Sequence, residues 1–204
     1  MTILESLKRT AERVTGWRRP SRRDLDELVR ARKPHCFRFE DDSVIPNNPD
    51  LAVVLYRSPV RLVDSFDPAA VFEELFDRNG WGDSWRNGIY DYVHYHSRIH
   101  EVLGIARGRG RVQLGGPKGR MFELKAGDVA ILPAGTGHQC IGASKDFLVV
   151  GAYPPFGKYD ECTTNEHDRA VVTIPKVARP RKDPVYGADG LLVPLWRKRA
   201  GGRH

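Results

Sequence analysis

The apolar residues of this chain fall mainly into short runs, which predict β-strands rather than helices over its central part. These runs are short enough for strands and are separated by turns that contain glycine, a pattern typical of a β-sandwich or barrel. The runs that we interpret as strands cover residues 51–56, 89–96, 101–106, 111–114, 121–124, 129–132, 138–141 and 147–153, after a first alternating segment from residue 35.

Helical periodicity is limited to segments that precede the main group of strands. Apolar side chains recur at helical spacing over residues 3–14, and a capping-box pattern at 21–24 begins a second, short helix. An Asp-Pro pair at 67–68 is typical of a helix start, and an Asn-Gly pair at 79–80 is typical of its end. We therefore expect helices at these places and a body built from strands.

Two further segments have weaker patterns. Residues 81–87 hold two tryptophans without a clear alternation, so we expect a loop that leads into the strand at 89–96. Residues 154–190 are irregular and contain several prolines. We expect the apolar run 191–196 to return to the sheet as an edge strand, because Pro194 cannot donate a hydrogen bond to a central ladder.

The candidate chemistry lies on the strand at 89–96 and on the strands that follow it. His94 and His96 are two positions apart, so on a strand both imidazoles point to one face, with Cα atoms about 6–7 Å apart. Glu101 opens the next apolar run, which can fold back beside the first, and His138 begins another predicted strand. Imidazoles and a carboxylate that converge from neighbouring strands form a ligand set for a divalent cation.

The spacing of the first group resembles the first of the two motifs of the cupin superfamily. That motif reads Gly, five residues, His-x-His, three or four residues, Glu, six residues and Gly. Gly88, His94, His96, Glu101 and Gly108 match it without a gap. The resemblance implies that His94, His96 and Glu101 bind a metal.

The second cupin motif reads Gly, five residues, Pro-x-Gly, two residues, His, three residues and Asn. Gly127, Pro133, Gly135 and His138 match it, and Gly142 stands where the family has Asn. The departure removes a supporting side chain and leaves the fourth implied ligand, His138, in place.

Further stretches resemble an uncharacterised family of small bacterial single-domain cupins, over roughly residues 37–196. This resemblance implies an all-β fold, the double-stranded β-helix or jelly-roll barrel, with a bound metal and often a homodimer, but it brings no known reaction. We accordingly divide the chain into a basic helical arm (1–35), a cupin β-barrel domain (36–196) and a basic disordered tail (197–204).

The formal charge of +7 is concentrated at the two ends of the chain. Residues 1–35 carry ten Lys or Arg and five Asp or Glu, residues 197–204 add four Lys or Arg, and +7 − 5 − 4 leaves −2 for the middle. The basic arm permits a nucleic-acid role, but it is short for a domain with its own core. We interpret it as an arm that packs on the body or on a partner subunit, and nucleic acid and membranes are not expected partners.

The number and spacing of the cysteines, together with the length of the apolar runs, indicate the cellular compartment. The three cysteines (Cys36, Cys140 and Cys162) are odd in number and widely scattered, which favours a reduced cytoplasmic protein over a disulfide-bonded secreted one. The first residues meet a charge before a signal-peptide region could form, and no run approaches a membrane span. We therefore expect a cytoplasmic protein.

Three residues near the implied ligands are candidates for catalysis. Tyr92 shares the face of the paired histidines and could act as an acid or orient a ligand, with core packing as the alternative. Cys140 comes two residues after His138 and should look into the cavity as a reactive thiol or as a small apolar filler. Arg86 precedes the metal strand and would suit an anionic substrate, with a surface salt bridge as the alternative.

His100 stands directly before Glu101 and is the main ambiguity among the histidines. If the strand already runs through it, its side chain faces away from Glu101 and lies outside the pocket. It would replace a ligand only if the strand bulges there. We interpret it as a surface histidine or as one that supports the ligands.

The function hypothesis that follows is a metal-dependent enzyme acting on a small anionic or carbonyl-bearing metabolite at a mononuclear site of three His and one Glu. Such a site leaves a divalent cation with open positions, which suits oxygenase chemistry first and isomerase or hydrolase chemistry next. Fe, Mn, Ni, Co and Zn all remain open as the metal. The alternative is a non-catalytic metal-containing binding or sensor module whose basic arm contacts a partner or nucleic acid.

Overall fold

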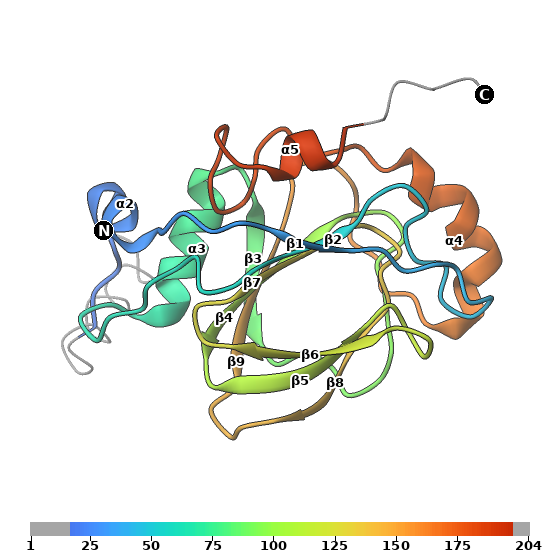
Figure 1. Ribbon diagram of the computed structural model, residues 1–204, viewed down its shortest axis with the longest axis horizontal. Helices are drawn as coiled ribbons and strands as arrows, with labels where there is room; N and C mark the ends of the chain where they lie inside the picture. Colours follow the sequence, from blue (N-terminus) through green and yellow to red (C-terminus); the bar gives the residue numbers. More distant parts are fainter. Residues whose placement is uncertain (1–16, 198–204) are drawn as a thin grey trace, which may run out of the picture.

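The computed structural model describes residues 17–197, whose strands form two antiparallel sheets that face each other (Figure 1). Within that range the larger sheet has the strand order β1-β2-β7-β4-β9-β3, and the smaller has the order β6-β5-β8. The strands are β1 (His35–Phe37), β2 (Val53–Tyr56), β3 (Gly82–Asn87), β4 (Glu101–Arg107), β5 (Arg109–Leu114), β6 (Arg120–Lys125), β7 (Val129–Leu132), β8 (His138–Ala143) and β9 (Leu148–Tyr153). The predicted all-β sandwich or barrel is confirmed.

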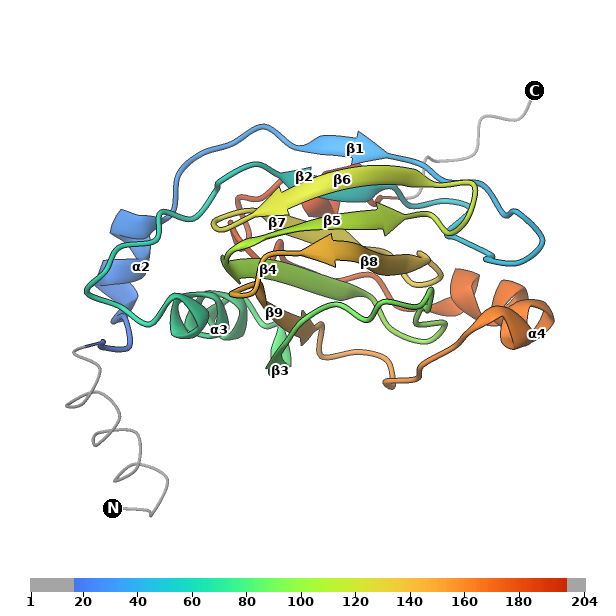
Figure 2. The same cartoon turned by 90° about the horizontal axis from the view of Figure 1, so that it is seen from below.

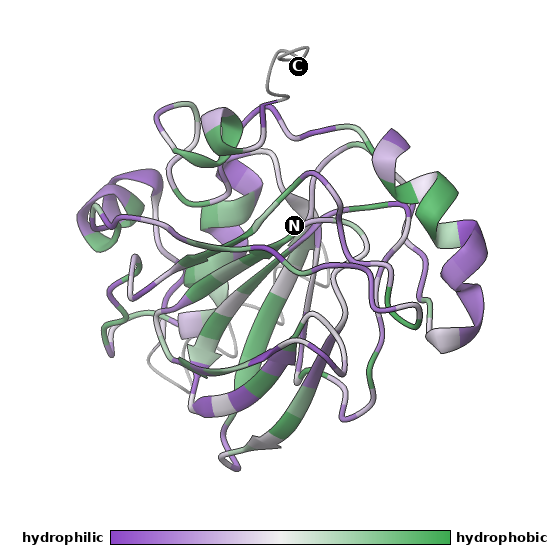
Figure 3. Cartoon of the chain, turned by 45° about the vertical axis from the view of Figure 1, so that its right-hand side comes forward, coloured by the Kyte–Doolittle hydropathy of each residue, from purple (hydrophilic) through white to green (hydrophobic). Residues whose placement is uncertain are grey.

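The inner strands of the larger sheet, β2, β7, β4 and β9, are buried on both faces, which explains why their sequences are continuous apolar runs. On β4, Leu103 and Ile105 lie in the cluster between the two sheets, whereas Val102 and Ala106 lie in a second cluster beneath the helices. Figure 3 shows apolar residues along the strands, and both apolar and hydrophilic residues on the surrounding helices and loops. The alternation decides which side chains of β4 and its neighbours can reach the interior of the sandwich.

The capping residues predict a helix here, and the structure shows helix α3 (Pro68–Arg78). It covers the outer face of the larger sheet. The carboxylate of Asp67 accepts a hydrogen bond from the backbone N–H of Ala69 at 3.1 Å, and an N-cap of this kind contributes about 1 kcal/mol. Gly104 permits the close approach of the helix to β4, because a Cβ atom there would lie 2.4 Å from Cδ1 of Phe72.

Helix α2 (Arg22–Leu28) belongs to the predicted basic arm and packs into the same core. Ser21 and Asp24 form the expected capping box, in which the Ser21 N–H donates to the Asp24 carboxylate at 2.7 Å. Leu25 and Leu28 are buried in the cluster that α3 also enters. This part of the arm is therefore joined to the body. The helix expected over residues 3–14 and most of the predicted tail lie outside the described residues.

The segment after β9 wraps around the sandwich. It contains η1 (Thr164–Glu166), α4 (His167–Thr173), η2 (Ile174–Lys176) and α5 (Leu192–Leu195). Figures 1 and 2 show α4 at one end of the sandwich, and Figure 1 shows α5 on the side away from β5, β6 and β8. No helix in residues 17–197 has the length and apolar character needed to cross a membrane.

Three expectations about secondary structure were wrong. Residues 82–87 form the edge strand β3, which pairs with β9, and residues 89–96 form no continuous strand but are held by single bridges, such as that between His94 and His138. Residues 191–196 include α5 instead of an edge strand. Its helical spacing brings Leu192 and Trp196 together in the core, with the Trp196 N–H donating to the Leu192 carbonyl at 2.9 Å.

Candidate metal centre

His94, His96 and His138 converge between the two sheets. One nitrogen atom from each lies within 4.8 Å of the others, and each residue is at most 5% exposed. His138 begins β8, and although His94 lies outside any strand, its backbone pairs with that of His138: the His138 N–H donates to the His94 carbonyl at 2.9 Å. This pairing brings their ring centroids to 4.1 Å. The described residues thus include a buried group of three imidazoles that can hold a metal ion.

The orientation of each imidazole is set by a backbone carbonyl at its Nδ1 atom. The partners are the carbonyl oxygens of Tyr92 for His94 (3.3 Å), of Asp160 for His96 and of Thr136 for His138 (3.0 Å). A carbonyl oxygen only accepts hydrogen bonds, so each Nδ1 carries a proton and each Nε2 is left to face the cluster. Support of this kind holds metal-binding histidines in their coordinating tautomer.

Glu101 completes the cluster from the first position of β4. It shares the strand face of Leu103 and Ile105, which places its side chain between the sheets. Its Oε2 lies 3.5 Å from Nε2 of His96 and 3.4 Å from Nε2 of His138. That oxygen is buried and has no hydrogen-bond partner among the described residues. An orphaned carboxylate oxygen facing two ring nitrogens fits a cation ligand, so the residues present suit a divalent metal.

The pKa values of the cluster show how its charges depend on one another. Burial favours a neutral Glu101, but the surrounding imidazoles, His96 foremost, lower the pKa of Glu101 to about 2. Burial likewise opposes charge on His96, but the Glu101 carboxylate raises the pKa of His96 to about 9. Burial and the neighbouring His94 lower the pKa of His138 to about 3. The proton on His96 supplies the positive charge that keeps Glu101 ionised. A bound cation can supply this charge instead.

Glu101 is supported by a short chain of side chains from β9 and β3. Tyr153 follows Ala152, the partner of Val102 in the β4–β9 pairing, so its ring lies on the same face as Glu101. Its hydroxyl accepts a hydrogen bond from the Trp85 indole at 2.8 Å. Burial raises the pKa of Tyr153, and so do the charge of Glu101 and the hydrogen bond that Tyr153 donates to it. The Trp85 ring crosses β9 at Gly151, where an added Cβ atom would lie 2.1 Å from it.

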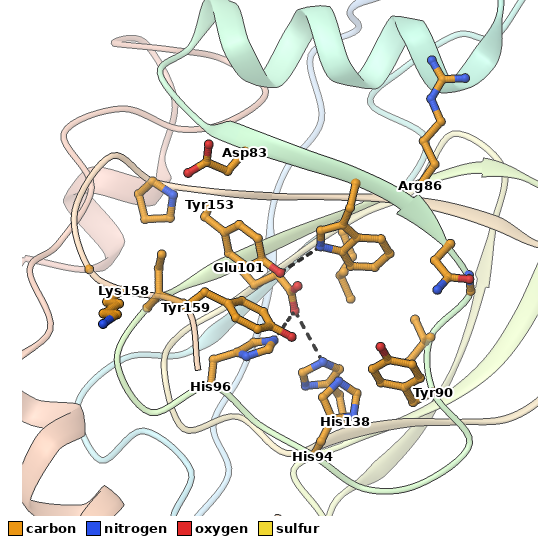
Figure 4. Close-up of a pocket in the computed structure, with 18 of the residues that line it drawn as sticks. Asp83, Arg86, Tyr90, His94, His96, Glu101, His138, Tyr153, Lys158 and Tyr159 are labelled. Carbon is orange, nitrogen blue, oxygen red and sulfur yellow. Dashed lines mark hydrogen bonds and ion pairs between the residues drawn. The ribbon is translucent and has the colours of Figure 1, made fainter. Parts of the chain in front are cut away.

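A cavity of about 660 Å³ opens onto the cluster (Figure 4). The four potential ligands stand at its wall, together with the aromatic rings of Trp85, Tyr90, Tyr153 and Tyr159. Lys158 and Asp83 also line it. A concave, largely aromatic space with a few converging polar groups is typical of a small-molecule site.

His100 lies outside this cavity. It faces the helix side of the larger sheet, opposite to Glu101, and packs against Trp196 with ring centroids 4.9 Å apart. Its Nδ1 accepts a hydrogen bond from the Ala134 N–H at 2.9 Å, and burial lowers the pKa of His100 to about 3. The predicted orientation away from Glu101 is confirmed, but the residue is fully buried and not at the surface.

Of the three catalytic candidates, the structure brings only Tyr92 beside the cluster, where its ring lies 5.5 Å from that of His94 between centroids. The Tyr92 side chain is 42% exposed, and its hydroxyl donates to Glu161 at 2.7 Å. Cys140 is buried on β8 but does not line the cavity, contrary to expectation. Arg86 borders the cavity, but its guanidinium points towards α3, as Figure 4 shows, and forms ion pairs with Glu73 and Asp67. Arg86 therefore forms a salt bridge, the alternative that we gave for it from the sequence.

The sequence interpretation missed three residues that border or support the cluster: Tyr153, Tyr159 and Asp160. Tyr153 could have been found, since it shares the strand face of Gly151 and Val149, within a segment correctly predicted as a strand. Tyr159 and Asp160 lie in an irregular segment with no periodic signal. Asp160 holds the turn after His96, where its carboxylate accepts hydrogen bonds from the N–H (3.0 Å) and hydroxyl (2.6 Å) of Ser97.

Comparison with known proteins identifies the family. Residues 87–150, which contain all four potential ligands, match the family model of the cupin domain. The chain is also 38% identical over 169 residues to the uncharacterized protein YjlB of Bacillus subtilis (strain 168), an alignment that covers 82% of this chain and 99% of YjlB. The chain is a cupin of the YjlB family. Both sheets of this cupin fit the double-stranded β-helix that the motifs implied.

Solved structures similar to this cupin have low overall superposition scores. An uncharacterized double-stranded β-helix protein from Klebsiella pneumoniae is 19% identical with a TM-score of 0.33, covering 69% of this chain and 93% of that chain. WlaRA, a TDP-fucose-3,4-ketoisomerase from Campylobacter jejuni, is 12% identical with a TM-score of 0.35, covering 46% and 74%. The acireductone dioxygenase of Bacillus anthracis, with cadmium in its active centre, is 24% identical with a TM-score of 0.31, covering 45% and 64%.

Proposed function

We propose that this cupin is a metal-dependent enzyme that acts on a small anionic or carbonyl-bearing metabolite. The observation that carries the proposal is the buried group of three imidazoles with the orphaned oxygen of Glu101 beside them, at the wall of a cavity large enough for a metabolite. His94, His96, His138 and Glu101 would hold one divalent transition metal, with Fe, Mn, Ni, Co and Zn all compatible with the donor set.

The donor set supports a catalytic role for the metal over a purely structural one. Structural zinc sites are closed by four ligands that often include thiolates, and they do not require a cavity. Three neutral imidazoles and one carboxylate leave a divalent cation with a net positive charge facing the cavity. When bound, the metal would supply Lewis-acid polarisation of a substrate oxygen or, with a redox-active metal, oxygenase chemistry.

The side chains around the cluster would bind the substrate and exclude water. Lys158 lines the cavity and has no ion pair among the described residues, so its ammonium group is available to an anionic group. Arg86, by contrast, is already neutralised by Glu73 and Asp67. Glu101 is only 2% exposed, and burial of this kind strengthens electrostatic interactions at the cluster.

Among reaction classes we place oxygenase chemistry first and isomerase or hydrolase chemistry next. The test begins with elemental analysis of protein purified without added metal or chelator. Oxygen uptake by the Fe(II)-loaded protein is then measured over a panel of carboxylate and carbonyl metabolites, with His138→Ala as the inactive variant. Absence of bound metal, or turnover that survives His138→Ala, would refute the proposal.

A further inference from the structure

Strongly exposed aromatic side chains are confined to the surroundings of the cavity. Within residues 17–197 they are Tyr90 (43%), Tyr92 (42%), Phe156 (37%) and Tyr159 (50%), and all lie in the segments 88–94 and 154–161. Isolated exposed apolar residues are common on any protein, but a group of aromatic rings around one opening is typical of a binding surface. The position of these rings therefore bears on what the cavity takes up.

The tyrosines are held in place and not left free in solvent. Tyr90 stacks on Tyr92 with ring centroids 4.9 Å apart and an interplanar angle of 14°. The hydroxyls of Tyr92 and Tyr159 donate to the same carboxylate, that of Glu161, at 2.7 and 3.2 Å. Glu161 thus joins the two segments, and the fixed rings lose little conformational freedom when a ligand packs against them.

Three of these rings lie near the candidate metal ligands, and that of Tyr92 is 5.5 Å from His94 between ring centroids, beside Tyr90. Tyr90 lies 5.1 Å from His94 between ring centroids, and Tyr159 lies 5.1 Å from His96. Figure 4 shows Tyr90 and Tyr159 on opposite sides of the imidazoles of His94 and His138. Both line the cavity, so a ligand that reaches the imidazoles passes between two aromatic rings.

We propose that the cavity binds a flat, conjugated carboxylate, whose ring system packs between Tyr90 and Tyr159 and whose carboxylate is received by Lys158 or by the metal ligand cluster. The inference rests on the proposed function and names the substrate class of the same site. Ring faces favour stacking with another π system, beyond the simple gain from buried area.

The polar groups of the cavity argue against a saturated, hydroxyl-rich ligand such as a sugar. A sugar ring also packs on aromatic faces, but its hydroxyls require several hydrogen-bonding side chains around the ring. Apart from the potential metal ligands and the paired Arg86, the charged or amide side chains that line the cavity in the described chain are Asp83, Asn87 and Lys158. Lys158 is the one cation among these three, which suits one anionic group on an otherwise apolar ring.

The test compares two probes with the same carbon skeleton and charge, 2-naphthoate and decahydro-2-naphthoate, which differ in flatness and conjugation. Binding of each to the full chain is measured by isothermal titration calorimetry, on chelator-treated protein and on protein saturated with Zn²⁺. We expect 2-naphthoate to bind at least about tenfold more tightly than the saturated probe. Stacking of its conjugated ring on each of the two tyrosines adds to the free energy gained by burying apolar area. Equal affinity, tighter binding of the saturated ring, or no binding of either probe would overturn the inference.

Variants then locate the contact. Tyr90→Leu and Tyr159→Leu retain apolar bulk but remove a ring, so each should lower the affinity for 2-naphthoate several-fold and leave that for the saturated probe unchanged. Phe156→Leu is the matched control: this ring is exposed in the same loop as Tyr159 but does not line the cavity. An equal loss of 2-naphthoate affinity in Phe156→Leu, or no loss in the two tyrosine variants, would contradict binding between Tyr90 and Tyr159.

The outcomes separate this inference from the proposed function. Protein that selects 2-naphthoate but contains and binds no metal would refute the metal enzyme and leave the substrate class standing. Protein that binds metal at His94, His96 and His138 but does not distinguish the two probes would refute the substrate class alone.

Discussion

The hydroxyl of Tyr153 offers a sharp test of how Glu101 is held. The Trp85 indole donates to this hydroxyl at 2.8 Å, so the tyrosine proton is free to point at the Glu101 carboxylate. The replacement Tyr153→Phe keeps the buried ring and removes the hydroxyl, and with it both the contact to Glu101 and the acceptor of the Trp85 N–H. If Glu101 is a metal ligand, its orientation should loosen and metal affinity should fall.

The expected size of this effect follows from the surrounding contacts. Loss of a group that orients a metal ligand generally lowers metal affinity by about 10–100-fold. The carbonyl contacts of His94, His96 and His138 stay intact in Tyr153→Phe, so we expect the lower end, about tenfold. The Trp85 N–H also loses its acceptor, which we expect to lower the free energy of unfolding by about 1 kcal/mol.

The assay is competition for Zn²⁺ or Co²⁺ between the protein and a chromophoric chelator, at fixed pH. Tyr159→Phe is the matched control, because Tyr159 lines the same cavity but its hydroxyl bonds to Glu161. Its metal affinity should equal that of the unaltered protein. Unchanged affinity in Tyr153→Phe, or an equal fall in Tyr159→Phe, would show that the hydrogen bond to Glu101 does not position a ligand. Thermal unfolding of each metal-free variant separates this effect from a loss of fold.

Four further predictions follow from the same structure. His96→Ala and His138→Ala should lower the metal content measured by elemental analysis while circular dichroism shows a preserved fold; unchanged stoichiometry in both would exclude them as ligands. His100→Ala should leave the metal content intact but lower the unfolding free energy by about 1–3 kcal/mol, because the Ala134 N–H is left unpaired; a metal loss like that of His96→Ala would contradict its position outside the cluster. Gly104→Ala should lower the free energy of unfolding by about 1–3 kcal/mol through overpacking against α3, seen as a lower thermal midpoint, and a neutral result would show that the helix can shift. Metal affinity should fall by up to about tenfold for each pH unit below 9, because the proton that the raised pKa of His96 retains must leave before its Nε2 can coordinate; pH-independent binding between 6 and 8 would contradict this.

Short sequence patterns were sufficient to predict the elements whose formation depends on residues that are neighbours in the chain. The strand β7 was predicted with its observed ends, because a strand buried on both faces must be a continuous apolar run. The start of α3 was readable because Asp67 and Pro68 act within one helical turn. The resemblance to the cupin motifs also grouped the three histidines and Glu101 as one ligand set, although His138 lies far from the other three in the sequence.

Tertiary contacts decided what these patterns could not. The edge strand β3 has little apolar alternation and exists because β9 offers it a partner, and α5 is a helix because Leu192 and Trp196 fit the core together at that spacing. Arg86 turns from the cavity because α3 and its N-cap residue each present a carboxylate to it, and Tyr153 and Tyr159 reach the cluster from segments far along the chain. Residue type and short-range spacing are properties of the chain alone, whereas the direction of a side chain depends on neighbours that only folding brings into contact.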